Sequence, residues 1–273
     1  MGAASIRLQG APNFRDFGGV PAGGAFVVAS GRLFRSDLLK DATNADLEIL
    51  QHLGIKGVCD LRSAKERVRH ANRWPEGSPV TAIGPVPEPG LEAVQAGNLR
   101  DRIIADEFDP AEAREALAAG YRQMPVSLGP SLRAVFEYLL ETEAAPVLIH
   151  CTSGKDRSGF MAAMVLTALG AQRDAILVDY LLSRERTPKE PIRQMLRRTL
   201  GEALPEARLD MLLELTTVRA EYLDAAFAEI EQNHGGIELY LRDIAGLGPE
   251  ELLFLRTQLL IDRRASQDIR DAP

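Results

Sequence analysis

The chain has 273 residues, of which 45% are hydrophobic, so it can bury a full core and fits one large domain. Its formal net charge of -7 argues against broad binding of nucleic acid, because a negative surface repels a polyanion. Two cysteines are too few for a disulfide framework, which is consistent with a reducing compartment. We therefore expect a single domain over residues 1–273 and no nucleic-acid partner.

The remaining composition gives no sign of a metal site, a cofactor or a membrane segment. The four histidines and two cysteines lack the spacing of metal ligands, so we expect no metal and no cofactor. Residues 1–10 lack the basic and apolar parts of a secretory leader, and no stretch is long and apolar enough to span a bilayer. We expect a cytoplasmic protein without stable membrane insertion, although export without a cleaved leader would leave the same sequence.

The first elements in chain order are short. Runs of β-prone residues at 26–29 and 33–34 are separated by Gly31, which predicts a hairpin at a sheet edge. A capping pattern at Thr43 then opens an apolar helix that stops at Gly54. The sequence therefore predicts a hairpin followed by one well-delimited helix.

A strand follows over residues 55–61, and its end carries a carboxylate. Ser63 and Glu66 form a capping-box pair for a short helix that runs through His70. Asp60 thus lies where the strand ends. Because ligands of parallel α/β sheets gather at the carboxyl ends of the strands, Asp60 could face the same crevice as polar residues that follow a neighbouring strand.

The middle of the chain combines a long loop with two helices. Residues 75–100 hold five prolines and several glycines, which indicates a surface loop with a short strand at 80–83. Apolar periodicity predicts helices at 110–119 and 131–140. Loops of this length beside an α/β sheet often shape the entry of a substrate.

The C-terminal third is helical by its pattern. Periodic apolar residues predict helices at 176–181, 218–230 and 249–261. The stretch 184–204 is different, because prolines bound a short amphipathic helix that carries several arginines. One interpretation of 184–204 is an ordinary surface helix with a solvated basic face.

The most informative stretch is residues 146–169, which reads as strand, tight loop and helix. A loop that closes onto a helix N-terminus turns several backbone N–H groups toward one point, where a phosphate dianion fits. Cys151 ends the strand, and the helix N-terminus, Arg157 and His150 all favour its thiolate form. Arg157 offers a planar fork that can hold two phosphoryl oxygens and stabilise their charge. The pattern predicts an anion site that contains a nucleophile.

Other residues of this loop have supporting roles. His150 could act electrostatically on the thiolate or hold the shape of the loop through its ring nitrogens, and both roles stay open. Ser158 can donate a hydrogen bond to the sulfur, and glycines allow the tight turn. We expect the substrate phosphate to be bound by Thr152, Ser153, Gly154, Lys155 and Ser158.

The segment HCTSGKDRSG resembles the HC-x5-R-[ST] signature of cysteine-dependent protein tyrosine phosphatases, and specifically the GKDR subgroup of bacterial enzymes. The resemblance spans nearly the whole chain and is most specific in this loop. It implies a central, mostly parallel sheet flanked by helices, with a helical lid over residues 184–215. Further similar segments lie at 13–19, 31–36, 60–63, 218–223 and 240–243.

The resemblance also implies the reaction. Cys151 would attack phosphorus to give a cysteinyl-phosphate, which water then cleaves. An acid that protonates the leaving oxygen contributes about a hundredfold or more. The subgroup implies Asp156 as that acid, while Asp60 could act instead or support the loop.

We therefore predict a protein tyrosine phosphatase that acts on phosphotyrosine in proteins or peptides. Dual specificity, with phosphoserine or phosphothreonine as secondary substrates, is compatible with this prediction. Lys155 adds a cation of the kind found in phosphoinositide phosphatases, so that activity is the main alternative. Sulfur transfer, arsenate reduction and a noncatalytic phosphate-binding module are less favoured, since Ser158 and an intact Cys151 and Arg157 suit phosphoenzyme chemistry. Cys59 is interpreted as a buried structural thiol.

Overall fold

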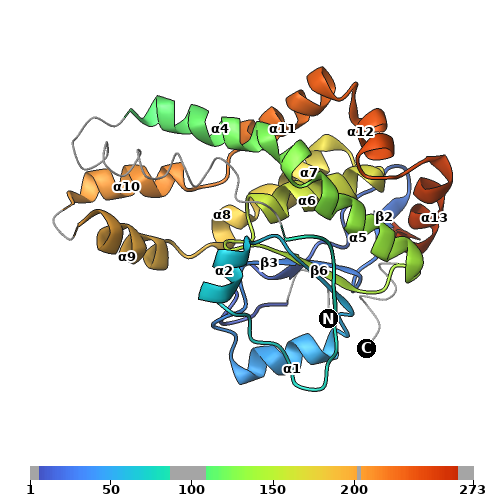
Figure 1. Cartoon of the computed structure of the whole chain (residues 1–273), viewed down its shortest axis with the longest axis horizontal. Coiled ribbons are helices and arrows are strands. Elements are labelled where there is room, and N and C mark those ends of the chain that lie inside the picture. Colours follow the sequence, from blue (N-terminus) through green and yellow to red (C-terminus); the bar gives the residue numbers. More distant parts are fainter. Residues whose placement is uncertain (1–5, 87–108, 202–203, 264–273) are drawn as a thin grey trace.

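The computed structural model describes residues 6–86, 109–201 and 204–263, and Figure 1 shows how its helices surround a central sheet. Five strands in the order β1-β3-β6-β4-β5 form this sheet. Four of them run parallel, and β1 pairs antiparallel with β3 at one edge. The predicted mostly parallel α/β sheet is confirmed. The strands are β1 (Arg15–Asp16), β3 (Leu33–Ser36), β4 (Gly57–Asp60), β5 (Thr81–Ala82) and β6 (Val147–His150).

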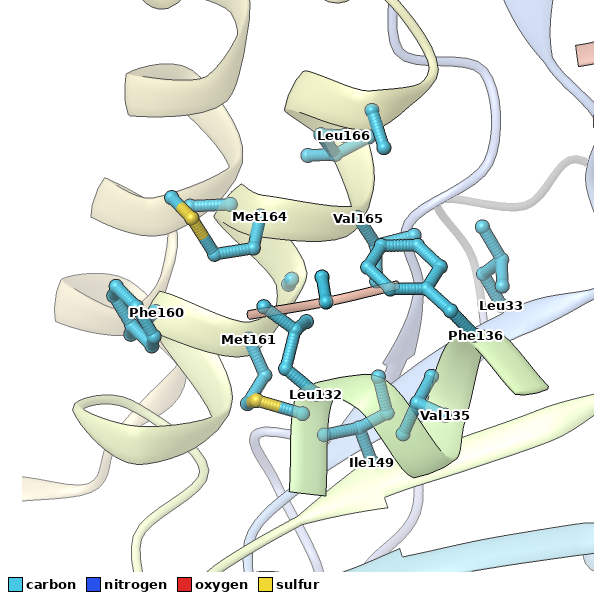
Figure 2. Packing of buried hydrophobic residues seen from close by; sticks show 14 of the residues in the cluster. Leu33, Leu132, Val135, Phe136, Ile149, Phe160, Met161, Met164, Val165 and Leu166 are labelled. Atoms are coloured by element: carbon cyan, nitrogen blue, oxygen red, sulfur yellow. The ribbon is translucent and has the colours of Figure 1, made fainter. Parts of the chain in front are cut away.

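The central strand β6 is buried along its whole length, and its side chains alternate between two cores. Leu148 packs in the smaller core together with Leu50 of α1 (Asn44–His52), and Figure 1 shows α1 on one side of the sheet. Helix α2 (Ala64–Arg69) follows β4 and has no buried residue. Ile149 packs in the larger core, and Figure 2 shows it close to Val135. This alternation is what a strand covered by helices on both faces requires.

Helix α6 (Arg157–Ala168) is the most enclosed helix of the described chain. Every residue from Ser158 to Leu166 is buried, so neighbouring helices surround it on all sides. The loop that follows β6 therefore ends on a helix that packing holds in place. Six further helices contribute buried residues to the same core as α6: α4 (Pro110–Ser127), α5 (Gly129–Glu141), α7 (Arg173–Leu181), α11 (Ala220–Asn233), α12 (Ile237–Asp243) and α13 (Pro249–Leu259).

Most predicted helices occupy their predicted places, and α4 is the main extension. We predicted a helix over 110–119, but α4 continues to Ser127. Tyr121 and Met124 extend its buried face by two turns beyond the predicted end. Tertiary packing thus lengthens the helix even though Pro125 lies inside it.

The predicted N-terminal hairpin is wrong. Strand β2 (Phe26–Val28) pairs with β7 (Leu260–Asp262) in a separate two-stranded sheet, whereas β3 joins the main sheet. The carboxylate of Asp16 accepts hydrogen bonds from the N–H groups of Gly18 at 2.7 Å and Gly31 at 2.5 Å. Gly31 has φ +79°, which a glycine adopts without strain. The chain therefore turns between β2 and β3, so that β3 does not pair with β2. The partner of β2 is β7, near the other end of the sequence.

The described residues of the stretch 184–215 are mostly helical, as predicted, and form α8 (Ser183–Arg186), α9 (Lys189–Leu200) and α10 (Glu206–Leu215). We call α9 and α10 the helical arm. In Figure 1 the arm extends beyond the sheet beside α4. Its apolar residues, with Ala113 of α4, form a small third cluster apart from the two main cores. The arrangement alone does not make the arm a lid.

Two further predictions are only partly covered by the described residues. The short strand predicted at 80–83 is present as β5, but residues 87–108 of the predicted loop lie outside the described ranges. Within those ranges no helix combines the length and apolar character needed to cross a membrane.

Candidate active site

The phosphate loop, residues 151–157, links β6 to α6 and begins with Cys151, which is 2% exposed. Four successive backbone carbonyls of this loop accept hydrogen bonds from groups outside the loop. Because the C=O and the following N–H of a trans peptide point in opposite directions, the N–H groups of residues 153–156 turn to the inside of the loop. The outside donors are the N–H of Leu38 to Thr152 (3.2 Å), Nδ2 of Asn13 to Ser153 (2.9 Å) and Nη2 of Arg35 to Gly154 (2.9 Å) and Lys155 (3.3 Å).

Gly154 is required by the close approach of this loop to β3. It has φ +64°, and a Cβ there would lie 2.4 Å from the carbonyl carbon of Ser36 and the nitrogen of Asp37. Both are backbone atoms, which cannot move aside cheaply. The packing of loop on strand therefore depends on a residue without a side chain.

Arg157 is oriented by Glu66, a residue that the sequence marked only as a helix cap. The Glu66 carboxylate accepts from Nη2 and Nη1 of Arg157 at 3.0 and 3.1 Å and from the Thr152 hydroxyl at 2.6 Å. The carbonyl of Leu61 accepts a further bond from Arg157 at 2.9 Å. Burial would raise the pKa of Glu66, but the hydrogen bonds and charge of Arg157 hold it well below its ordinary value. Glu66 is thus ionised and fixes the guanidinium beside the loop.

Asp156 lies in the loop with a donor on each carboxylate oxygen. The Tyr121 hydroxyl donates to Oδ1 at 2.7 Å, and the Lys155 ammonium lies 2.9 Å from Oδ2. Tyr121 is hydrogen-bonded in turn to the hydroxyl of Tyr180 at 2.6 Å. Burial raises the pKa of Asp156, but the Lys155 charge and these hydrogen bonds lower it overall. The carboxyl is therefore ionised in the protein without substrate.

Asp60 is brought close to His150 by the pairing of β4 with β6, and it is held by arginine. Its carboxylate accepts from Nε and Nη2 of Arg62 at 2.9 and 2.8 Å and lies 3.5 Å from Nε2 of His150. Burial raises the pKa of Asp60, but the Arg62 hydrogen bonds and nearby positive groups lower it overall. This geometry suits bracing of the strand ends better than proton donation.

His150 is fully buried, with polar groups at both ring nitrogens. Nδ2 of Asn72 lies 3.1 Å from Nε2, and the Cys151 carbonyl lies 3.4 Å from Nδ1. Burial is the largest effect on the pKa of His150 and lowers it to about 4. A ring that is neutral at pH 7 can hold the loop but supplies no positive charge to the thiolate.

Lys155 and Ser158 complete the predicted set. The ammonium of Lys155 donates to the carbonyl of Thr216 at 2.7 Å, directly after α10, as well as contacting Asp156. Ser158 is fully buried in the first turn of α6, and its hydroxyl has no hydrogen-bond partner among the described residues. The loop therefore contacts the end of the helical arm through its lysine.

Cys59 lies apart from this chemistry. It is a buried free thiol on β4, and burial raises its pKa to about 12. The described part of the chain holds no group of three potential ligands that could bind a metal ion.

Sequence reasoning missed the groups that support the loop from behind. Asn13, Arg15 and Arg35 lie in segments that carried the family resemblance, but nothing in their spacing pointed to the loop. Asp179 left a signal: it sits between apolar residues in α7, on the buried side, next to Tyr180. A carboxylate in such a place needs a buried partner.

Comparison with known proteins agrees with the geometry. Residues 6–261 match the family described as "Tyrosine phosphatase family". The chain is 34% identical to the "Triple specificity protein phosphatase PtpB" of Mycobacterium tuberculosis, over 93% of this chain and 98% of that protein. It is 37% identical to a tyrosine-protein phosphatase of Cupriavidus necator, over 89% of this chain and 85% of that one.

A more distant relative, "Tyrosine-protein phosphatase" of Nostoc commune, is 26% identical over 88% of this chain and 78% of that protein. The family match covers nearly all of the described residues, including the phosphate loop and the groups behind it. The predicted hydrolase class is therefore confirmed: the chain belongs to the tyrosine phosphatase family.

Proposed function

We propose that the protein hydrolyses phosphomonoesters through a cysteinyl-phosphate on Cys151, with phosphotyrosine in a protein or peptide as its preferred substrate. The observation that supports this most is that the carbonyls of residues 152–155 accept hydrogen bonds from outside the loop, which leaves the N–H groups of residues 153–156 to point inward. Preorganised donors of this kind bind a tetrahedral oxyanion without reorganising during the reaction.

In the first step the Cys151 sulfur attacks phosphorus, an S–P bond forms, and the bond to the leaving oxygen breaks with its electron pair. Asp156 gives that oxygen a proton. In the second step Asp156 takes a proton from water, whose oxygen attacks phosphorus while the sulfur leaves as thiolate. Arg157 stabilises the equatorial oxygens, and the Ser158 hydroxyl donates to the departing sulfur.

Asp156 must take up a proton before it can act as an acid, because it is ionised in the protein without substrate. A phosphate dianion bound next to it raises the pKa of the carboxyl by repulsion between like charges. The same dianion competes with Asp156 for the Lys155 ammonium, which lies 2.9 Å from the carboxylate. Substrate binding thus favours the protonated acid.

Hydrolysis of p-nitrophenyl phosphate and of alkyl phosphates tests the mechanism. Cys151→Ser should abolish turnover, and unchanged turnover would reject the proposal. Asp156→Asn should slow esters with poor leaving groups more than p-nitrophenyl phosphate, because only the former depend on protonation. Equal losses on both classes would assign Asp156 a structural role and reopen the question of Asp60.

Phosphoinositide is the second candidate substrate. The ammonium of Lys155, a residue of the loop, favours a ligand with an additional phosphate, and the relative from Mycobacterium tuberculosis bears the name of a triple specificity phosphatase. We infer that Lys155→Met lowers kcat/KM more for phosphoinositides than for phosphotyrosine peptides. Equal losses would limit Lys155 to support of a single phosphate.

We also propose that residues 184–215 act as a lid over a cytoplasmic enzyme, as the family resemblance implies. The bond from Lys155 to Thr216 at the end of α10 supports this. Leu196→Asp would break the small apolar cluster of the arm and should speed alkylation of Cys151 by iodoacetamide. An unchanged rate of alkylation would reject the lid.

The cytoplasmic location is tested separately by cell fractionation. Recovery of the protein outside the cytoplasmic fraction would reject it.

A further inference from the structure

Behind the phosphate loop lies a buried cluster of two arginines and one aspartate. Arg15 and Arg35 are 2% and 0% exposed, and both pair with Asp179 of α7. Nε of Arg15 donates to Oδ1 of Asp179 at 2.9 Å, and Nη1 of Arg35 donates to Oδ2 at 2.6 Å. One carboxylate therefore bridges two guanidinium groups from two adjacent strands of the sheet, β1 and β3.

Each arginine of this cluster leads to the loop. Nη2 of Arg35 donates to the carbonyls of Gly154 and Lys155. Nη1 of Arg15 donates to Oδ1 of Asn13 at 2.6 Å, which fixes the amide so that its Nδ2 donates to the carbonyl of Ser153. Three of the four outward loop carbonyls thus depend on groups that a single carboxylate orients.

The cluster is hard to explain by stability alone. Charges taken out of water lose their hydration, and well-packed apolar side chains of similar volume often stabilise a core as well or better. A charged core is useful where it fixes a direction, since the planar fork of an arginine can join a carboxylate on one side to carbonyls on the other. That is the geometry of Arg35 here.

We propose that Asp179 is a positioning residue for phosphoryl transfer, which through Arg15 and Arg35 keeps the N–H groups of the phosphate loop directed at the phosphate. This rests on the proposed function of the loop. Asp179 itself has no hydrogen bond to the loop. It acts by holding the two arginines in the orientation in which Arg35, and Asn13 through Arg15, donate hydrogen bonds to the loop carbonyls.

The sign of the effect separates positioning from simple charge. Replacing Asp179 by asparagine removes a negative charge near the loop, and by charge alone this would strengthen phosphate binding and favour the Cys151 thiolate at lower pH. If instead the asparagine lets the arginines and the loop turn, phosphate binding weakens and the thiolate forms only at higher pH. The two accounts predict opposite shifts.

The test compares Asp179→Asn with Arg35→Lys, which keeps the positive charge but loses the fork. For each variant we would measure kcat and KM for p-nitrophenyl phosphate, inhibition by inorganic phosphate, and the pH midpoint of Cys151 alkylation by iodoacetamide. Both variants should lose about a hundredfold in kcat/KM, as small misplacements near a reacting centre do. Both should also bind phosphate more weakly and shift the alkylation midpoint upward.

Asp46→Asn is the matched control, because Asp46 is also a buried carboxylate held by backbone N–H groups, but it caps α1 and has no bond to the loop. It should lower thermal stability and leave all three measurements unchanged. All assays are run below the melting temperature of each variant. If Asp179→Asn does not fold, Arg35→Lys and Asn13→Ala decide the matter through the same shifts.

Phosphate binding that is unchanged or stronger, together with an unchanged or lower alkylation midpoint, would overturn the proposal. Failure of the proposed function looks different. In that case the wild-type protein hydrolyses no phosphoester, while phosphate binding and alkylation still report whether Asp179 positions the loop.

Discussion

The phosphate loop and the helical arm are both rich in arginine–carboxylate pairs, yet the pairs differ in surroundings. Behind the loop, Arg35 and Asp179 pair with side chains that are 0% and 6% exposed. On the arm, Arg193 of α9 pairs with Glu206 and Asp210 of α10, whose side chains are 61% and 62% exposed. Buried pairs fix a geometry and are costly to break, whereas exposed pairs contribute little. The phosphate loop is thus supported by a buried ion pair, whereas the ion pairs of the arm are exposed and stabilise it only weakly.

The largest effect should come from Arg157→Lys, which keeps the charge but loses the fork. Removal of one preorganised donor to a developing anion costs roughly 100- to 1000-fold in kcat. We expect a loss of that size for p-nitrophenyl phosphate in steady-state assays. Arg193→Lys on the arm is the control and should retain wild-type kcat; a comparable loss there would erase the contrast between the two regions.

Glu66→Gln should have the next largest effect. It removes the charge that orients Arg157 while nearly preserving the shape of the side chain. We expect a fall of about tenfold or more in kcat, because Arg157 then samples other orientations. Glu206→Gln on the arm is the matched substitution. Equal kcat values for the two variants would show that Glu66 only caps α2.

Asp37 makes the stability of the loop scaffold depend on pH. It lies at the end of β3 against Gly154, and burial raises its pKa from 3.8 to about 7. The unfolded chain releases this proton near pH 4 and the folded protein near pH 7, so stability is present below pH 4 and lost as pH rises through 7.

Asp37→Asn removes that loss. Relative to wild type, the variant should gain about 2 kcal/mol between pH 4 and pH 8, roughly half of the full shift at 1.4 kcal/mol per pKa unit, because the side chain is only partly buried. Urea unfolding at several pH values measures this gain. A difference that stays constant with pH would mean that Asp37 titrates normally.

Tyr121→Phe should shift the pH profile of kcat/KM by a smaller amount. The Tyr121 hydroxyl donates to Asp156, and this bond favours the ionised carboxyl. Without it the pKa of Asp156 rises, so activity should persist to higher pH by about one unit or less, as expected for one hydrogen bond. Tyr222→Phe is the control, since the Tyr222 hydroxyl has no partner among the described residues. An unmoved basic limb in Tyr121→Phe would separate Asp156 from the acid role.

The smallest effect is expected on the arm. Arg193→Ala breaks exposed ion pairs and should leave the unfolding midpoint close to that of the wild-type protein. Asp179→Ala leaves two buried guanidinium groups without their carboxylate and should cost about 3 to 5 kcal/mol. Thermal or urea unfolding compares the two. Similar costs would show that the arm is held as firmly as the loop.

The sequence predicted the elements whose signals are local. The strand, loop and helix around Cys151 carry their pattern in adjacent residues, and the capping box at Ser63 and Glu66 is present in the structure. The features that the sequence did not predict depend on contacts between segments far apart in the chain. Strand β2 pairs with β7 across almost the whole chain, and the bridge of Asp179 to Arg15 and Arg35 joins three separate segments. Neither leaves a mark in local spacing.

The role of Glu66 was hidden for a related reason. The capping box alone explains a glutamate at position 66. Its hydrogen bonds to Arg157 and Thr152 join distant segments, so the sequence pattern could not predict them. Asp156 was found as a loop residue, but its ionised state depends on Tyr121 from a helix that comes thirty-five residues earlier in the chain. Charge states of buried groups require the fold.

The most direct measurement is rapid acid quenching of the wild-type protein during turnover of a phosphotyrosine peptide, followed by mass spectrometry of its proteolytic fragments. A phosphoryl group should be found on Cys151, and it should accumulate in Asp156→Asn if water activation in the second step is slowed. A protein that turns over the peptide without ever carrying phosphate on Cys151, or that carries it on another residue, would contradict this account.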